Sequence, residues 1–157
     1  MASRIIELPA TAHPKVLAAH SYWQKVTPAN GVLPGRKHID PIDIPSLLEN
    51  IWLIDVLADP QRFRVRLIGE KLRRLGNPVK PGDFLDRHLA DTAASMADMR
   101  FVVVERKPVW FRGQAELRHT TTVFELERLF LPFAADGATV DLIIGVAIFY
   151  TLQGKLI

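Results

Sequence analysis

The stretch IWLIDVLADPQRFRVRLIGEKLRRLG, residues 51–76, decides the fold. Its first part, residues 51–58, is apolar at almost every position, which is typical of a strand covered on both faces. Residues 62–68 alternate apolar side chains with arginines, a pattern that predicts an edge strand with one face in water. An Asp-Pro pair supplies the turn between the two strands. The stretch therefore predicts an antiparallel hairpin, followed at Gly69 by a short basic helix.

Composition excludes several classes of protein. The chain has 157 residues, 48% of them apolar, and this length fits one domain with its own core. A formal net charge of +3 is too mild for a dedicated nucleic-acid binder, so nucleic acid is not expected as a partner. The absence of cysteine excludes disulfides, thiolate metal sites and cysteine nucleophiles. Because no apolar run forms a signal peptide or membrane span, we expect a cytoplasmic protein with no membrane partner.

The residues before the hairpin predict a helix and a linker. Pro14 suits the first helical position. Apolar side chains then recur at helical spacing on one face, and they are the candidate interface residues: Val16, Ala19, Trp23 and Val26. This stripe is expected to cover the sheet or to pair with a second copy of the chain. We therefore divide the chain into a helix with a Pro-rich linker, residues 1–35, and a domain, residues 36–157.

The second half of the chain predicts one long helix and three further strands. Helical spacing of apolar residues covers residues 86–105. Residues 109–118 alternate as an edge strand, residues 123–133 are mixed, and residues 139–152 are apolar on both faces. Apolar strands belong in the centre of a sheet and alternating ones at its edges, so the order 2-1-5-4-3 is expected. The fold class is α+β, with crossover helices in residues 69–107 on one face and the N-terminal helix or a second subunit on the other.

The sequence resembles the small single-domain PAS family that is common in alphaproteobacteria. The resemblance runs over residues 33–85, with Trp23 before them. It rests on the following residues in order: Trp23, Leu33-Pro34, Arg36, Ile39-Asp40-Pro41, Ile44, Leu47-Leu48, Arg62-Phe63-Arg64, Leu67, Gly69, Gly76 and Gly82. It implies a sensory or regulatory module that binds a small ligand or a protein partner. The expected output is in trans, through the N-terminal helix, to a separate effector, with the chain as a homodimer. The alternative is a ligand-free dimerisation or docking scaffold.

A ligand pocket, if present, would lie between the sheet and the long helix. The side chains expected to line it are Phe63, Val65, Leu67, Leu72, Leu89, Met96, Phe111, Phe130, Ile144 and Ile148. The same side chains could instead fill the core completely. We expect a filled or nearly filled core, and the identity of any ligand stays open.

Cofactor chemistry has one candidate residue. His88 begins the long helix, the region from which haem-binding PAS domains supply an axial ligand; a solvated polar residue is the alternative. The absence of cysteine excludes a covalent cysteinyl-flavin, whereas a non-covalent flavin stays open without support. The cofactor is therefore unknown at this point.

Charged residues give no catalytic pattern. Asp83 and Asp86 are interpreted as helix-start residues rather than as an acid and base pair. The five arginines of the hairpin and the next helix form either a basic patch or the wet face of an edge strand: Arg62, Arg64, Arg66, Arg73 and Arg74. No triad or metal-ligand spacing is present, so we expect neither an enzyme nor a metal site.

Overall fold

The sheet has five antiparallel strands in the order β2-β1-β5-β4-β3, as the sequence predicted. The computed structural model describes residues 7–75, 79–87, 92–116 and 123–157. The strands are Ile51–Leu57 (β1), Arg62–Ile68 (β2), Val109–Glu116 (β3), Val123–Phe133 (β4) and Leu142–Tyr150 (β5). β1 and β5 occupy the inside of the sheet, and β2 and β3 are its edges.

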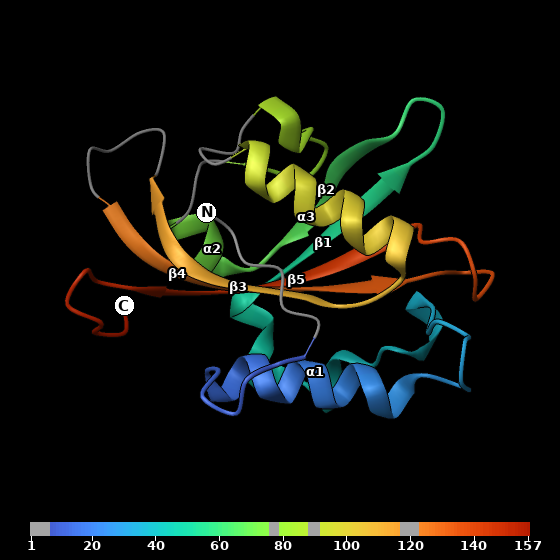
Figure 1. The fold of residues 1–157 in the computed structure, drawn as a ribbon, viewed down its shortest axis with the longest axis horizontal. Helices are drawn as coiled ribbons and strands as arrows, with labels where there is room; N and C mark the ends of the chain where they lie inside the picture. Colours follow the sequence, from blue (N-terminus) through green and yellow to red (C-terminus); the bar gives the residue numbers. More distant parts are fainter. Residues whose placement is uncertain (1–6, 76–78, 88–91, 117–122) are drawn as a thin grey trace.

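Helices cover both faces of this sheet (Figure 1). The α-helices are Pro14–Val26 (α1), Glu70–Leu75 (α2) and Thr92–Glu105 (α3). The 3₁₀-helices are Arg36–His38 (η1), Pro41–Asp43 (η2), Pro45–Asn50 (η3) and Leu85–Arg87 (η4). Figure 1 shows α1 on one face, which we name the outer face, and α3 on the opposite, inner face. The N-terminal helix therefore covers the sheet of its own chain.

The helix ends follow local chemistry. α1 begins at Pro14, as expected, and the Nδ1 atom of His13 caps it by accepting the Lys15 N–H at 3.0 Å. The long helix α3 begins at Thr92, later than the predicted start at residue 86, because residues 85–87 form η4. The predicted boundary of β3 at residue 118 lies outside the described residues.

Each face of the sheet has its own apolar core. The inner core includes Ile54, Phe63 and Met99, all at most 1% exposed. The outer core includes Val16 of α1 and Val146 of β5, both at 0%. Every residue of β5 is buried, because alternate side chains of this strand enter opposite cores. Because both faces of β5 are buried, its sequence has no alternating polar residues.

A β-bulge interrupts the predicted alternation of β2. The β1–β2 register shifts between Leu53 and Ile54, so that Leu53 faces Leu67 whereas Ile54 faces Val65. Phe63 and Val65 are buried on the inner face, as the alternation predicts. Leu67 is 47% exposed, so its prediction as a pocket wall was wrong. Because β2 has one extra residue at the bulge, every side chain after it points to the face opposite to the one that the alternation predicts.

Candidate functional site

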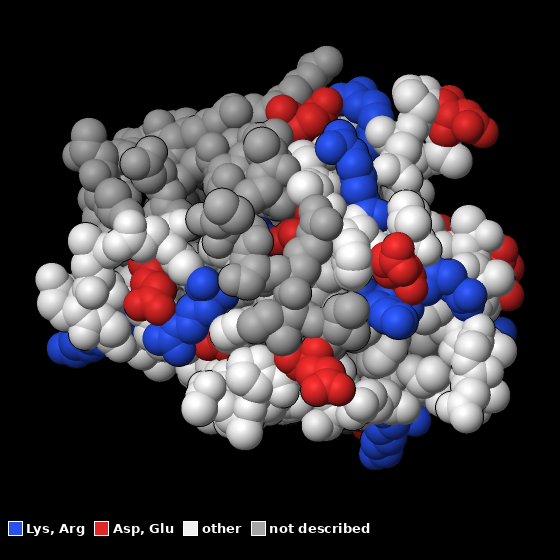
Figure 2. All heavy atoms as spheres, viewed as in Figure 1, with Lys and Arg blue, Asp and Glu red and all other residues white. Residues whose placement is uncertain are grey.

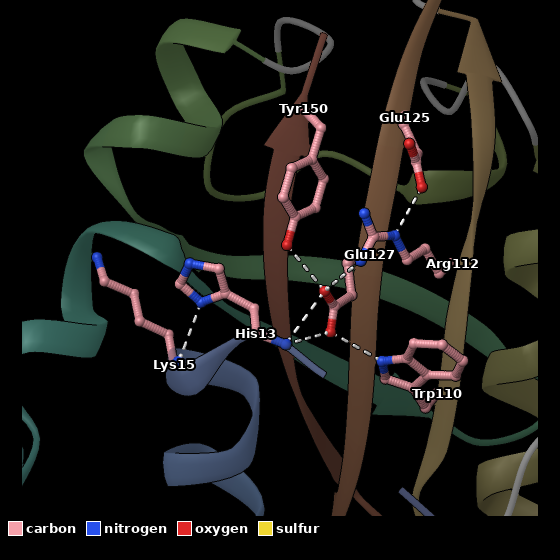
Figure 3. Close-up of polar contacts among 7 residues, drawn as sticks. All are labelled: His13, Lys15, Trp110, Arg112, Glu125, Glu127 and Tyr150. Carbon is pink, nitrogen blue, oxygen red and sulfur yellow. Dashed lines mark hydrogen bonds and ion pairs between the residues drawn. The ribbon is translucent and has the colours of Figure 1, made fainter. Parts of the chain in front are cut away.

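A buried carboxylate on the outer face organises the contacts between α1 and the sheet. Glu127 of β4 has no exposed surface, and a buried charge needs hydrogen-bond donors. Its carboxylate accepts from the backbone N–H of His13 at 2.9 Å, the indole N–H of Trp110 at 3.0 Å and the hydroxyl of Tyr150 at 2.9 Å (Figure 3). The guanidinium of Arg112 lies 3.9 Å from the same carboxylate. We name Glu127, His13, Trp110 and Tyr150 the Glu127 node.

The sheet register brings the node together. Glu127 faces Arg112 on β3 and Ile148 on β5. Trp110 and Tyr150 each lie two residues from those partners, on the same face, and a long side chain reaches such a diagonal neighbour. The fourth member, His13, is placed by α1, whose first residue follows it. One carboxylate thus joins three strands to the start of a helix.

The electrostatics of the node follow from burial. Burial first, and then the hydrogen bond to Glu127, raise the pKa of Tyr150 to about 12, so the phenol remains a donor at neutral pH. Burial is also the main reason that the pKa of His13 lies below its ordinary value, although Glu127 opposes the shift. A neutral His13 imidazole can accept the Lys15 N–H through Nδ1. The ion pair with Glu125, at 2.6 Å, raises the pKa of Arg112.

The C-terminal half of α1 is fastened by a second polar contact. The Trp23 indole N–H donates to the carbonyl oxygen of Pro132 in β4 at 2.8 Å. Of the predicted interface stripe, Val16 and Ala19 are buried against this chain's own sheet, and Trp23 and Val26 are half-buried. A cavity of about 20 Å³, lined in part by Trp23, remains between α1 and the sheet, about the size of one water molecule. The apolar stripe of α1 therefore packs on the sheet of its own chain and is not a free surface.

The predicted pocket walls divide between the two faces. Five of them belong to the inner core: Phe63, Val65, Leu72, Met96 and Phe130. Phe111 is buried beside Arg128. Ile144 and Ile148 lie in the outer core, so their assignment to the same pocket was wrong. In a strand that is apolar throughout, no alternating polar residues indicate which side chains face which core. Leu89 lies outside the described residues.

A buried ion pair lies within the inner face. Arg128 of β4 donates to the carboxylate of Asp98 and to the hydroxyl of Ser95, the latter at 2.6 Å, and both partners belong to α3. The guanidinium lies 4.6 Å from the centre of the Phe130 ring and 4.9 Å from that of Phe111. Sequence reasoning missed this pair and the Glu127 node. Their signal was the adjacent Glu127-Arg128 within residues 126–133, which are otherwise apolar.

The other predicted site residues have local structural roles. Asp83 accepts the Lys80 N–H at 3.0 Å, and Asp86 pairs with Arg62 at 3.2 Å. His88, the candidate haem ligand, lies outside the described residues. Within the described ranges, no group of three or more His, Asp or Glu residues could hold a metal ion. No helix in the described part of the chain is long and apolar enough to cross a membrane.

The five arginines do not form one free patch. Arg64 and Arg66 both pair with Asp55, at 3.4 and 2.7 Å, and Asp55 is only 7% exposed. Arg73 pairs with Glu70 at 2.6 Å. On the face shown in Figure 2, basic and acidic side chains of the described residues are interspersed. The hairpin arginines are thus mostly engaged with carboxylates.

The sheet order, the long crossover and the inner-face helices together define a PAS-type α+β fold, which is typical of sensory modules. A family model described as "PAS domain" matches residues 11–148. The chain belongs to the PAS domain family.

A search of solved structures found chains that are similar to this one. One similar chain is an RNA-binding Light-Oxygen-Voltage (LOV) receptor, with a TM-score of 0.50 and 13% identity over 94% of this chain. The match spans 37% of that receptor. Another is a fungal LOV domain photoreceptor, with a TM-score of 0.47 and 14% identity, covering 71% of this chain and 92% of that one. No curated protein matches significantly.

Proposed function

We propose that this PAS domain is a sensory or regulatory module whose output is the docking of α1 on the outer face, read by a separate partner in trans. The observation that carries the proposal is the Glu127 node. The buried carboxylate takes one hydrogen bond from the backbone of His13, which precedes α1. Release of α1 would leave that carboxylate short of a donor and exposed to water, so docked and released states are distinct.

The input in this proposal is a change in the inner core. Phe130 of the inner core follows Glu127 and Arg128 in β4, and Arg128 connects the strand to α3. A displacement of α3 would therefore act on the strand that carries the node. Two-state packing of this kind converts a small shift into a discrete change.

A flavin is one cofactor to consider for the inner face, because one similar structure is a LOV receptor. The polar edges of a flavin ring need several hydrogen-bond donors and acceptors from the protein. Arg128 already donates to Ser95 and to Asp98, and the Trp52 indole N–H is a buried donor that has no partner among the described residues. The chain has no cysteine to form an adduct. The described residues do not supply a flavin site, and the proposal rests on no flavin step.

The experiment is native mass spectrometry of freshly purified protein, combined with hydrogen exchange of α1. We expect a mass excess that disappears on denaturation, and slower or faster exchange of the α1 amides in loaded protein than in stripped and refolded protein. A ligand-free chain with α1 exchange unchanged under every condition would contradict ligand sensing.

The buried Arg128–Asp98 pair favours a second candidate, the ligand-free docking scaffold, which predicts a clean mass at twice that of the chain.

A further inference from the structure

A solvent-filled hollow lies on the outer face at the β2 edge of the sheet. It measures about 670 Å³ and is lined by the first turn of α1, by η3 and by the junction of β2 with α2. Leu48 and Leu67 lie in its lining and are 42% and 47% exposed. Neither residue belongs to the inner or the outer core. The hollow therefore presents apolar side chains that the fold itself does not use.

The shape of this hollow is fixed by the backbone. The bulge in β2 places Leu67 on the outer face. Gly69 lies so close to η3 that a Cβ atom there would be 2.5 Å from the carbonyl oxygen of Leu48. The Gly69 N–H also donates to Ile51 at 2.7 Å. The two leucines are thus held by backbone contacts, and such a preformed surface loses little entropy when it binds.

The rim of the hollow carries an excess of positive charge. Glu70, which lines the hollow, is paired with Arg73 at 2.6 Å. Glu49 bonds to Lys15 at 2.9 Å, and Lys15 first, then Lys71 and Arg74, lower the pKa of Glu49. Among the described residues, neither Lys71 nor Arg74 has an ion-pair partner. Both cations belong to α2 and act on Glu49, which lines the hollow, so they can also attract an incoming carboxylate.

We propose that this hollow docks an acidic segment of a partner protein. An apolar side chain of that segment would rest on Leu48 and Leu67, while its carboxylates would approach Lys71 and Arg74. Charge complementarity favours an acidic partner over a basic one. The lining contains aliphatic side chains and no aromatic ring on which a base could stack, which favours a peptide over a nucleic acid. The inference needs no ligand in the inner core and no movement of α1.

The test is selection of a phage-displayed library of random peptides on the purified chain, followed by affinity measurements on the enriched peptides. We expect sequences rich in Asp and Glu with a Leu, Ile or Phe anchor. Binding should weaken about tenfold in Leu67→Ser and in Arg74→Glu. Matched controls are Leu152→Ser, at a leucine that is 52% exposed elsewhere, and Arg100→Glu on α3. These controls should bind as the natural chain does.

Three results would overturn the proposal. They are no enrichment over an empty support, enriched peptides that bind Leu67→Ser unchanged, and enrichment of basic sequences. A single-stranded oligonucleotide that binds in an Arg74-dependent manner and displaces the peptides would assign the surface to nucleic acid instead. Amide shifts of Leu48, Leu67 and Gly69 on peptide addition to the natural chain provide a readout that does not depend on the folding of a variant.

Discussion

Glu127 and Arg128 are neighbours in β4, yet their charges have different kinds of partner on the two faces of the sheet. On the inner face, Arg128 meets an opposite charge, Asp98, and both side chains are at most 4% exposed. On the outer face, Glu127 accepts hydrogen bonds from the neutral donors of Trp110 and Tyr150 and from one backbone N–H, and the guanidinium of Arg112 lies 3.9 Å away. The inner charge is satisfied within the body of the domain. The outer charge takes one of its donors, the His13 N–H, from the start of α1.

The difference assigns separate tasks to the two faces. The buried Arg128–Asp98 ion pair joins α3 to the sheet, and removal of one partner takes an opposite charge away from a buried charge. Hydrogen bonds from a helix start are individually weaker and can be exchanged for water. We therefore expect the inner face to determine global stability and the outer face to determine the position of α1.

The largest effect is expected from Asp98→Ala, which leaves Arg128 buried without its carboxylate. The free energy of unfolding should fall by about 3–5 kcal/mol, measured by urea denaturation. The double variant Asp98→Leu with Arg128→Leu should recover much of this loss, because it leaves no unpaired charge. Equal losses in the single and double variants would show that packing, rather than charge, dominates the inner face.

A smaller effect is expected from Glu127→Gln. The amide retains one acceptor but turns an NH₂ group toward the donors of the node, so stability should fall by about 1.5–3 kcal/mol. The matched control is Glu125→Gln, two residues away on the same strand and face, whose side chain is 28% exposed. Its loss should be within about 1 kcal/mol. Similar losses in both variants would contradict the special role of Glu127.

Trp23→Phe tests the second fastening of α1. The substitution removes the N–H that binds Pro132 and should cost about 1 kcal/mol in unfolding free energy. Near-ultraviolet circular dichroism and urea denaturation provide the measurement. If the variant were as stable as the natural chain, the hydrogen bond to Pro132 would not contribute to the docking of α1, and the Glu127 node would be its only polar fastening of the two.

The smallest effect is a dependence of stability on pH. Burial lowers the pKa of His13 and of His20 from 6.5, so the unfolded chain takes up protons before the folded chain does. Stability should therefore fall as the pH decreases from 6.5 toward the folded-state values, and should be unaffected above that range. Charged groups that act on His13 are Glu127, Lys15, Lys71 and Arg112.

The pH effect can be removed without loss of the helix cap. In the double variant His13→Asn with His20→Gln, the asparagine still offers an acceptor at the N-cap while neither position titrates. We expect the slope of stability against pH below 6.5 to flatten. A slope that is the same in the double variant would assign the effect to other groups.

The sheet could be predicted from the sequence because each strand has a distinct burial pattern. Residues 51–58 and 139–152 are apolar on both faces, which places β1 and β5 at the centre. The Asp136-Gly137 pair is typical of a hairpin turn. In the structure, Gly137 has a φ of 80° and the Asp136 carboxylate accepts the Ala138 and Thr139 N–H groups.

The site could not be predicted because its partners are far apart in the sequence. The donors to Glu127 come from residues 13, 110 and 150, and only the register of β3, β4 and β5 brings them together. The exposure of Leu67 depends on a bulge that leaves no mark in the alternation. For the same reason, the face on which Ile144 and Ile148 lie was open until the register was known.

Hydrogen exchange of α1 in Glu127→Gln tests the central claim most directly. We predict that in this variant the exchange of the α1 amides, residues 14–26, accelerates about tenfold more than that of the β5 amides, which report the change in global stability. This result would mean that α1 is released while the sheet stays folded. Equal acceleration in α1 and β5, or no acceleration in α1, would contradict the claim that Glu127 controls the docking of this helix.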